Sequence, residues 1–228
     1  MTRVAVVQFA GTNCEVDTLR AAERAGADAY YVWHRDTDLQ GADAVILPGG
    51  FAYGDYLRAG AIARFSPIMS AVIAHAEAGG AVLGICNGFQ VLCEAGLLPG
   101  ALMRNAGLRF VARPVRVRIE QTGTPFTAAY EEGNIVTIPV AHGEGRYVAP
   151  ASILQDLEDD HRVVMRYVDV NPNGSLHDIA GITNAAHNVV GMMPHPERAA
   201  DPAIGATDGA AVFASIVACI GIPGGGSP

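Results

Sequence analysis

The sequence predicts an α/β protein: a doubly wound, mostly parallel sheet with an antiparallel extension in the C-terminal half. Up to residue 99, short apolar runs alternate with helical patterns at the spacing of strand–helix–strand units. After Pro99, apolar residues alternate with arginines, as in strands that expose one face. No internal repeat or long linker divides the 228 residues, so we predict one domain over residues 1–228.

The first half of the chain is predicted to contain four strands and three helices. The strands are short apolar runs at residues 3–9, 29–34, 44–47 and 81–85. We expect Asn13 to cap a helix that Gly26 ends, and Ser66 with Pro67 to open a second that Gly79 ends. The third helix runs from about residue 87 to 95. Ligands of such sheets bind where the strands end, so the loops at their carboxyl ends are candidate sites.

The second half is predicted to add strands and one final helix. The strands lie at residues 110–119, 135–140, 163–168, 179–185 and 189–193, and the helix lies at residues 209–220. We expect the last strand to return beside the parallel strands. Residues from about 222 to 228 are rich in glycine and are expected to form a flexible tail.

Composition excludes several classes of function. A formal net charge of -8 argues against a nucleic-acid partner, and no apolar run approaches the length of about 20 residues that spans a membrane. The four cysteines lack zinc-type spacing, which predicts no metal site and a reducing cytoplasm as the location. All 15 basic residues are arginines, so a Walker A lysine and a Schiff-base lysine are excluded. We therefore expect no cofactor in this chain.

A nucleophile is predicted where the strand at residues 81–85 ends. Gly84, Cys86 and Gly88 fit a G-x-C-x-G pattern, the cysteine counterpart of the G-x-S-x-G nucleophile elbow. The small flanking residues let strand and helix approach closely, and the helix N-terminus favours a thiolate. Most cysteines in apolar surroundings are inert core residues, so this reading requires a base elsewhere in the chain.

His195 and Glu197, in the segment GMMPHPER, supply a base and its orienter. Two prolines restrict the backbone there, and in an extended segment residues i and i+2 point to the same side. The carboxylate is then placed to orient and stabilise the imidazole, as nucleophilic catalysis requires. An edge strand with an incidental histidine and glutamate is the alternative.

Backbone amides complete the expected site. The N–H groups of Gly50 and Phe51, after the strand at residues 44–47, together with that of Asn87, are candidate donors for an oxyanion hole. The alternative is an ordinary glycine-rich turn. A nucleophile, base, orienter and oxyanion donors together indicate acyl transfer through a thioester.

These motifs resemble the class I (triad) glutamine amidotransferases, whose fold is flavodoxin-like. The resemblance is strongest to their subfamily of glutaminase subunits of phosphoribosylformylglycinamidine synthase. It rests on GTNC at 11–14, GGFAYGDYLR at 49–58, GICNGFQVLCEAGLLPGAL at 84–102, HGEGRY at 142–147, NPNGS at 171–175 and GMMPHPER at 191–198. These blocks span nearly the whole chain.

The resemblance implies a division of labour. Cys86 attacks the side-chain amide of L-glutamine, His195 moves the proton, Glu197 orients His195 and Gln90 helps to hold the substrate. Ammonia then passes to a large synthetase subunit, which converts formylglycinamide ribonucleotide to its amidine in purine synthesis. ATP and Mg²⁺ are expected on that subunit, and a small bridging subunit is expected in the complex.

Few residues depart from the expected pattern. Ala10 stands where proline is expected, Ala52 where serine is expected, and His187 where glycine is expected, a residue suited to a turn with positive φ. The polar loop at residues 142–147 is expected to face the synthetase. A cysteine hydrolase of similar architecture and a non-catalytic flavodoxin-like binding module are the alternatives, and the order Cys…His…Glu with PHPE favours the amidotransferase.

Overall fold

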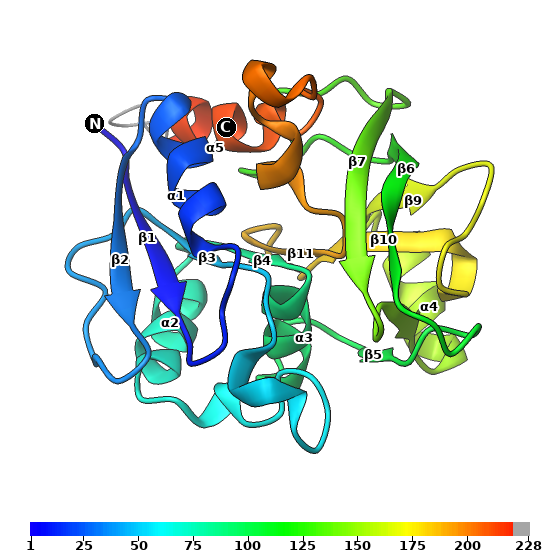
Figure 1. Cartoon of the computed structure of the whole chain (residues 1–228), viewed down its shortest axis with the longest axis horizontal. Helices are drawn as coiled ribbons and strands as arrows, with labels where there is room; N and C mark the ends of the chain where they lie inside the picture. Colours follow the sequence, from blue (N-terminus) through cyan, green and yellow to red (C-terminus); the bar gives the residue numbers. More distant parts are fainter. Residues whose placement is uncertain (221–228) are drawn as a thin grey trace.

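The computed structural model, which describes residues 1–220, confirms the predicted α/β fold. One nine-stranded sheet has the order β2-β1-β3-β4-β11-β10-β9-β6-β7, and β5 and β8 form a separate pair (Figure 1). The strands are β1 (Arg3–Gln8), β2 (Asp28–Trp33), β3 (Ala44–Leu47), β4 (Ala81–Ile85), β5 (Ala101–Met103), β6 (Val111–Ile119), β7 (Ile135–His142), β8 (Arg146–Val148), β9 (Val163–Tyr167), β10 (Ile179–Thr183) and β11 (Val189–Met192).

The sheet changes character at β11. Strands β2, β1, β3, β4 and β11 run parallel to one another, while β10, β9, β6 and β7 alternate in direction. The last strand therefore returns beside the parallel strands, as predicted. Burial follows the same division: every residue of β3 and β4 is buried, whereas in β6 Val115, Val117 and Ile119 are buried and the intervening arginines are exposed.

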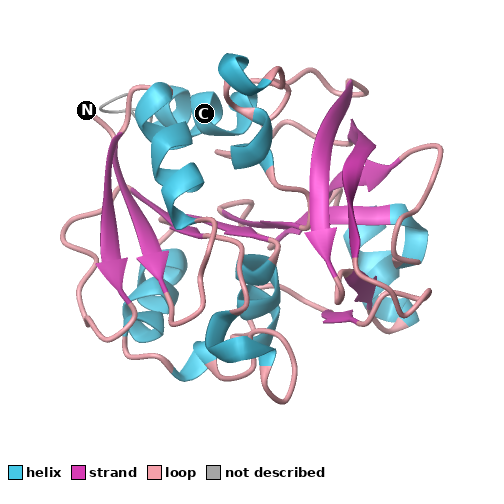
Figure 2. Cartoon of the chain, in the orientation of Figure 1, coloured by secondary structure: helices cyan, strands magenta, loops and turns pink. Residues whose placement is uncertain are grey.

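Helices cover both faces of the parallel half (Figures 1 and 2). α1 (Glu15–Arg24) and α5 (Ala210–Ile220) pack together on one face, and α2 (Ile68–Glu77) and α3 (Asn87–Glu94) lie on the other. α4 (Ala151–Asp159) lies beside the antiparallel strands. No helix in residues 1–220 combines the length and apolar character needed to cross a membrane.

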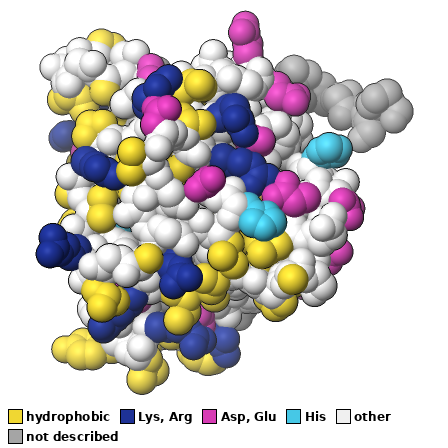
Figure 3. Space-filling model, turned by 90° about the vertical axis from the view of Figure 1, so that its right-hand side faces the viewer, with side chains coloured by type: hydrophobic (Ala, Val, Ile, Leu, Met, Phe, Trp, Pro, Cys, Tyr) yellow, Lys and Arg dark blue, Asp and Glu magenta, His cyan; other side chains and the backbone are white. Residues whose placement is uncertain are grey.

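Two of the three exposed arginines of β6, Arg116 and Arg118, lie close to acidic partners. Arg116 Nη1 lies 2.5 Å from Asp169 Oδ2, and Arg118 Nε lies 2.5 Å from Glu120 Oε1. On the face drawn in Figure 3, basic and acidic side chains are interspersed. The alternating arginines of the sequence thus belong to a mixed, ion-paired surface.

Several local predictions were wrong. Cys14, not Asn13, occupies the N-cap of α1, and Pro67, not Ser66, occupies that of α2; neither makes a side-chain cap. The sequence did not reveal α4, β5 or β8.

His187 adopts φ 58°, the positive-φ turn for which a glycine was expected. The predicted tail at residues 222–228 lies outside the described residues.

Five of the strands that end at one edge of the sheet lead into predicted site residues or their neighbours. β1, β3, β4 and β11 are parallel, and β7 points the same way because four antiparallel pairings, through β10, β9 and β6, separate it from β11. The chain leaves these strands near Cys14, Gly50, Cys86, His195 and His142 respectively. This topology gathers residues far apart in the sequence at the edge where doubly wound sheets bind ligands.

Candidate active site

Cys86 occupies a strained turn between β4 and α3. Its backbone has φ 50° and ψ -101°, an outlier of the kind that functional sites retain. A Cβ on Gly88 would lie 1.9 Å from the carbonyl oxygen of Leu47, and one on Gly84 would lie 2.6 Å from the backbone of Gly88. The two glycines are therefore required for helix α3 to pack this closely, as the elbow pattern predicted.

His195 and Glu197 form the predicted pair. Nδ1 of His195 lies 2.6 Å from Oε1 of Glu197, and both side chains are buried. The extended geometry proposed from the prolines is wrong, because Pro196–Ala199 forms a short 3-10 helix, η4. That turn brings the carboxylate back to the imidazole, while the His195 N–H donates to the carbonyl of Pro139 at 2.8 Å and fixes the backbone to β7.

The surroundings favour a proton on His195. Burial opposes the charged imidazolium, but the Glu197 carboxylate and then Cys86 raise the pKa of His195 well above its usual value. Nε2 of His195 is buried and has no hydrogen-bond partner within residues 1–220. The nitrogen facing away from Glu197 is thus available to exchange a proton with Cys86.

The three predicted oxyanion donors differ in whether their N–H groups already donate a hydrogen bond. The N–H of Phe51 donates to the carbonyl of Gly11 at 2.9 Å, so it is occupied in this conformation. No backbone hydrogen bond from the N–H of Gly50 or Asn87 occurs in the described part of the chain. Gly50 also packs tightly, since a Cβ there would lie 2.7 Å from Cα of Thr12.

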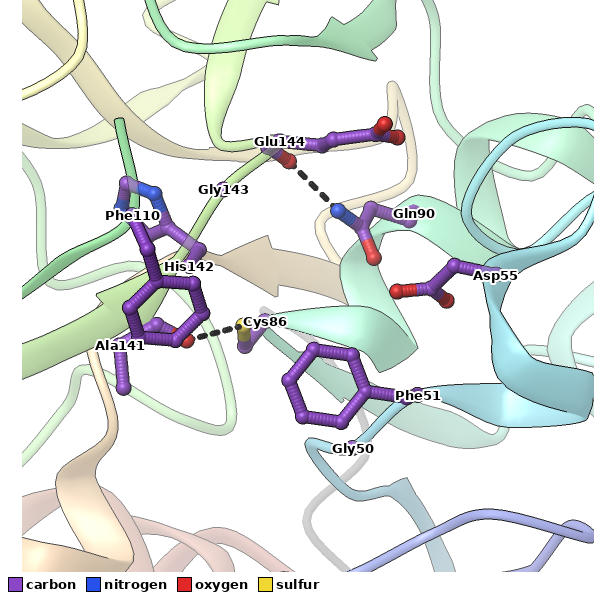
Figure 4. Close-up of a pocket in the computed structure, with 10 residues that line it drawn as sticks. All are labelled: Gly50, Phe51, Asp55, Cys86, Gln90, Phe110, Ala141, His142, Gly143 and Glu144. Carbon is purple, nitrogen blue, oxygen red and sulfur yellow. Dashed lines mark hydrogen bonds between the residues drawn. The ribbon is translucent and has the colours of Figure 1, made fainter. Parts of the chain in front are cut away.

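A pocket of about 110 Å³ opens above Cys86 (Figure 4). Gln90 lines it, as predicted, and its Nε2 donates to the carbonyl of Glu144 at 2.5 Å while its Oε1 accepts from Asn87 Nδ2 at 2.8 Å. The lining residues are Gly50, Phe51, Asp55, Cys86, Gln90, Phe110, Ala141, His142, Gly143 and Glu144. The volume suits a small molecule, and Asp55, Gln90 and Glu144 offer it polar contacts.

Sequence reasoning missed part of this pocket. The loop at residues 142–147 was expected to face a partner, yet His142 and Tyr147 are buried and Ala141 to Glu144 line the pocket. Burial and then His195 lower the pKa of His142 to about 4, so it lines the pocket as a neutral ring. Asp55 was also missed, although its position in the motif GGFAYGDYLR was a usable signal.

Cys14 lies against the His195–Glu197 pair. Its Sγ accepts from Arg198 Nη2 at 3.0 Å and lies 3.9 Å from Nδ1 of His195. Cys14, His195 and Glu197 also place one donor atom each within 4.8 Å, a trio that could hold a metal ion. Because the Arg198 cation already contacts Cys14, we assign these atoms to the hydrogen-bond network of His195.

Together, a cysteine elbow and a buried histidine–carboxylate pair at the ligand edge of a doubly wound sheet define the class I glutamine amidotransferases. Residues 1–207 match the profile of the CobB/CobQ-like glutamine amidotransferase domain. A relative from Rubrobacter xylanophilus, the PurQ subunit of phosphoribosylformylglycinamidine synthase, is 59% identical over 95% of this chain and 98% of its own. The PurQ subunit of Synechocystis sp. is 55% identical over 94% of this chain and 100% of its own.

Solved structures of related proteins have the same fold. In the structure of PurLQS from Thermotoga maritima, one chain is 44% identical, with a TM-score of 0.88 over 96% of this chain and 98% of that one. The glutaminase domain of a Trypanosoma brucei CTPS, at 18% identity and a TM-score of 0.65, shares the fold. The chain belongs to the glutamine amidotransferase family and, within it, to the PurQ subunits of phosphoribosylformylglycinamidine synthase.

Proposed function

We propose that this chain is the glutaminase subunit of phosphoribosylformylglycinamidine synthase and hydrolyses L-glutamine to glutamate and ammonia at Cys86. The observation that carries the proposal is the pairing of His195 with Glu197 at 2.6 Å beside an elbow cysteine at the floor of the pocket. A binding module needs no strained cysteine next to a charged histidine. A Cys-His-Glu triad can catalyse several acyl-transfer reactions, and the family membership indicates that this one is the hydrolysis of glutamine.

The first half-reaction transfers the glutamyl group to sulfur. Cys86 Sγ attacks the side-chain amide carbon of glutamine, and the carbonyl electron pair moves onto oxygen. His195 Nε2 takes the thiol proton and gives it to the leaving nitrogen. The C–N bond then breaks, ammonia leaves and a γ-glutamyl thioester remains on Cys86.

The second half-reaction regenerates the thiol. Water loses a proton to His195 Nε2 and attacks the thioester carbon, the C–S bond breaks, and glutamate leaves as Cys86 regains its proton. The amides of Gly50 and Asn87 are the proposed donors to the oxyanion in both steps, joined by that of Phe51 if its peptide turns. Gln90 is proposed to hold the substrate within the pocket.

The ammonia is proposed to serve a partner. PurQ relatives are named as subunits of a synthase, and a chain 44% identical to this one belongs to the solved structure of PurLQS from Thermotoga maritima. We propose that a large synthetase subunit, with a small bridging subunit, uses the ammonia to convert formylglycinamide ribonucleotide to its amidine. ATP and Mg²⁺ are proposed to bind on that partner rather than on this chain, and the complex is proposed to work in the cytoplasm.

Covalent labelling tests the glutaminase assignment. The complex is treated with 6-diazo-5-oxo-L-norleucine, a diazo-ketone analogue of glutamine, and the adduct is mapped by peptide mass spectrometry. Labelling of Cys86 that glutamine blocks is the expected result. Cys93→Ala is the matched control, because burial strongly raises the pKa of that thiol and keeps it protonated. An unlabelled Cys86 in the assembled complex would contradict the assignment.

A further inference from the structure

Asp55 brings an acidic side chain into the pocket. It lies in the loop that follows β3, and its carboxylate points toward Gln90 and the centre of the pocket (Figure 4). Asn87 Nδ2 donates to its Oδ1 at 3.2 Å. None of the ion pairs within residues 1–220 involves Asp55. Within that range the carboxylate therefore has no cationic side chain as an ion-pair partner.

The second acid of the pocket is already paired. Glu144 Oε1 lies 3.5 Å from Nε of Arg104, and its Oε2 accepts from the N–H of Ala59 at 3.4 Å. Glu144 therefore has a cation beside it in the unliganded chain. Asp55 is the acid of this pocket that a bound cation would neutralise.

The loop is held in a costly conformation to present Asp55. Tyr53, Asp55 and Leu57 all adopt positive φ, at 55°, 54° and 71°. Non-glycine residues at such angles cost of order 1–3 kcal/mol each and persist where the surroundings enforce them. Here Tyr53 is tied down, because its hydroxyl lies 2.7 Å from Nδ1 of His34 and 3.0 Å from Oγ of Ser66. This is backbone strain at a functional position.

The surroundings of Asp55 disfavour its negative charge. Burial and then Glu144 raise the pKa of Asp55 to about 6, because both disfavour the anion. A cation bound against the carboxylate would offset both effects. Glutamine carries one cationic group, its α-ammonium, at the end of the molecule remote from the amide that Cys86 attacks.

We propose that Asp55 binds the α-ammonium group of glutamine and thereby selects α-amino acid amides over amides that lack this group. The proposal rests on the glutaminase function proposed above. It assigns the substrate's reactive amide to Cys86 and its charged end to the Asp55 side of the pocket, with Gln90 between them. The selection is electrostatic: an uncharged analogue gains nothing from the carboxylate.

A purely structural role is the competing explanation. In that case Asp55 serves to accept the Asn87 hydrogen bond and hold the loop. Asp55→Asn separates the two, because the asparagine side-chain oxygen still accepts from Asn87 while the negative charge is removed. Asp55→Glu keeps the charge and is expected to restore part of the effect.

Binding to the full chain carrying Cys86→Ala, which cannot turn over substrate, gives the cleanest readout. Calorimetry compares L-glutamine with glutaramate, the same molecule without its amino group. Adding Asp55→Asn is expected to raise the Kd for glutamine about 10- to 100-fold, as loss of a charged hydrogen bond does, and to change that for glutaramate less than about threefold. Asp156→Asn, an exposed acid on α4, is the charge-matched control.

Each outcome decides the matter. An equal loss for both ligands, or no loss for glutamine, overturns the role of Asp55 while Cys86 labelling and glutamine hydrolysis by the wild-type complex leave the glutaminase function standing. A wild-type complex that does not hydrolyse glutamine overturns both. A selective loss that Asp55→Glu partly restores supports the assignment.

Discussion

Nδ1 of His195 and Oε1 of Glu197 lie 2.6 Å apart, and neither side chain is more than 2% exposed. One carboxylate oxygen thus fixes the imidazole and leaves Nε2 for Cys86. The second oxygen, Oε2, is buried without a hydrogen-bond partner in the part of the chain that the structure describes. The pair is held by the short turn of η4 rather than by a long-range contact.

Glu197→Gln tests whether this carboxylate acts through its charge. The amide is isosteric but cannot stabilise the imidazolium, so we expect kcat to fall about 10²- to 10⁴-fold with a smaller change in KM. The carboxylate raises the pKa of His195, so its loss should move the alkaline limit of activity to lower pH. Exposed Glu132→Gln is the control. An unshifted pH profile with full kcat would refute the assignment.

Gly49→Ala tests the space beside His195. An added Cβ would lie 2.6 Å from Cε1 of His195 and 3.2 Å from Sγ of Cys14, so the ring must move. A displacement of this size is expected to lower kcat about 10²-fold, with little effect on the circular dichroism spectrum. Gly107→Ala is the matched control, because a Cβ there meets nothing within 4 Å. Wild-type turnover by Gly49→Ala would show that the ring position is not critical.

Asp55→Asn should also stabilise the fold at neutral pH. The raised pKa, about 6 against an ordinary 3.8, means that the anion is less favourable in the folded than in the unfolded chain. Stability is therefore lost as pH rises between those values. Because water partly screens this half-buried carboxylate, removing the charge is expected to increase the free energy of unfolding by about 1–2 kcal/mol above pH 7, less than the full shift implies.

Three groups that face Asp55 determine how its charge affects stability. Glu144 repels it, Asn87 donates to it, and His142 across the pocket stays neutral because its own pKa is about 4. Urea unfolding of wild type and Asp55→Asn at pH 7.5 and pH 4 is the measurement. The advantage of the variant should vanish at pH 4, where Asp55 is largely protonated in the folded state. A destabilised variant at pH 7.5 runs against this account.

The isolated chain should turn over glutamine slowly. The Phe51 N–H donates to the carbonyl of Gly11, so it is not available as the third expected donor of the oxyanion hole in this conformation. Losing one such donor typically costs about 10²- to 10³-fold in kcat. Ammonia release, measured with and without the synthetase and its substrates, is expected to rise by about that factor on assembly. Equal turnover in both conditions would rule out this gating.

The sequence was sufficient where the signal is local. Gly84, Cys86 and Gly88 lie within five residues, and His195 and Glu197 within three, so their patterns predicted the elbow and the pair. α4 was missed although Leu154 and Leu157, buried at i and i+3, carried a helical signal. β5 and β8, with 3 residues each, are too short for periodicity to show.

The pocket wall around His142 could not be predicted, because the residues that hold it in place are far apart in the sequence. His142 is buried by contacts with Asn105 and Asn173, whose side-chain atoms lie 3.1 and 3.5 Å from its ring nitrogens. Those residues are 37 and 31 positions away in the chain, and no local pattern links them. Polar side chains that satisfy one another in this way look, in sequence, like a solvent-exposed loop.

Ammonia rescue in the assembled complex tests the central claim most directly. Formation of the amidine is measured in complexes with wild-type or Cys86→Ala chain, supplied with either glutamine or ammonium chloride as the nitrogen source. If Cys86 generates the ammonia that the synthetase consumes, Cys86→Ala abolishes synthesis from glutamine and leaves synthesis from ammonium chloride at the wild-type rate. Sustained glutamine-dependent synthesis by Cys86→Ala would contradict the account.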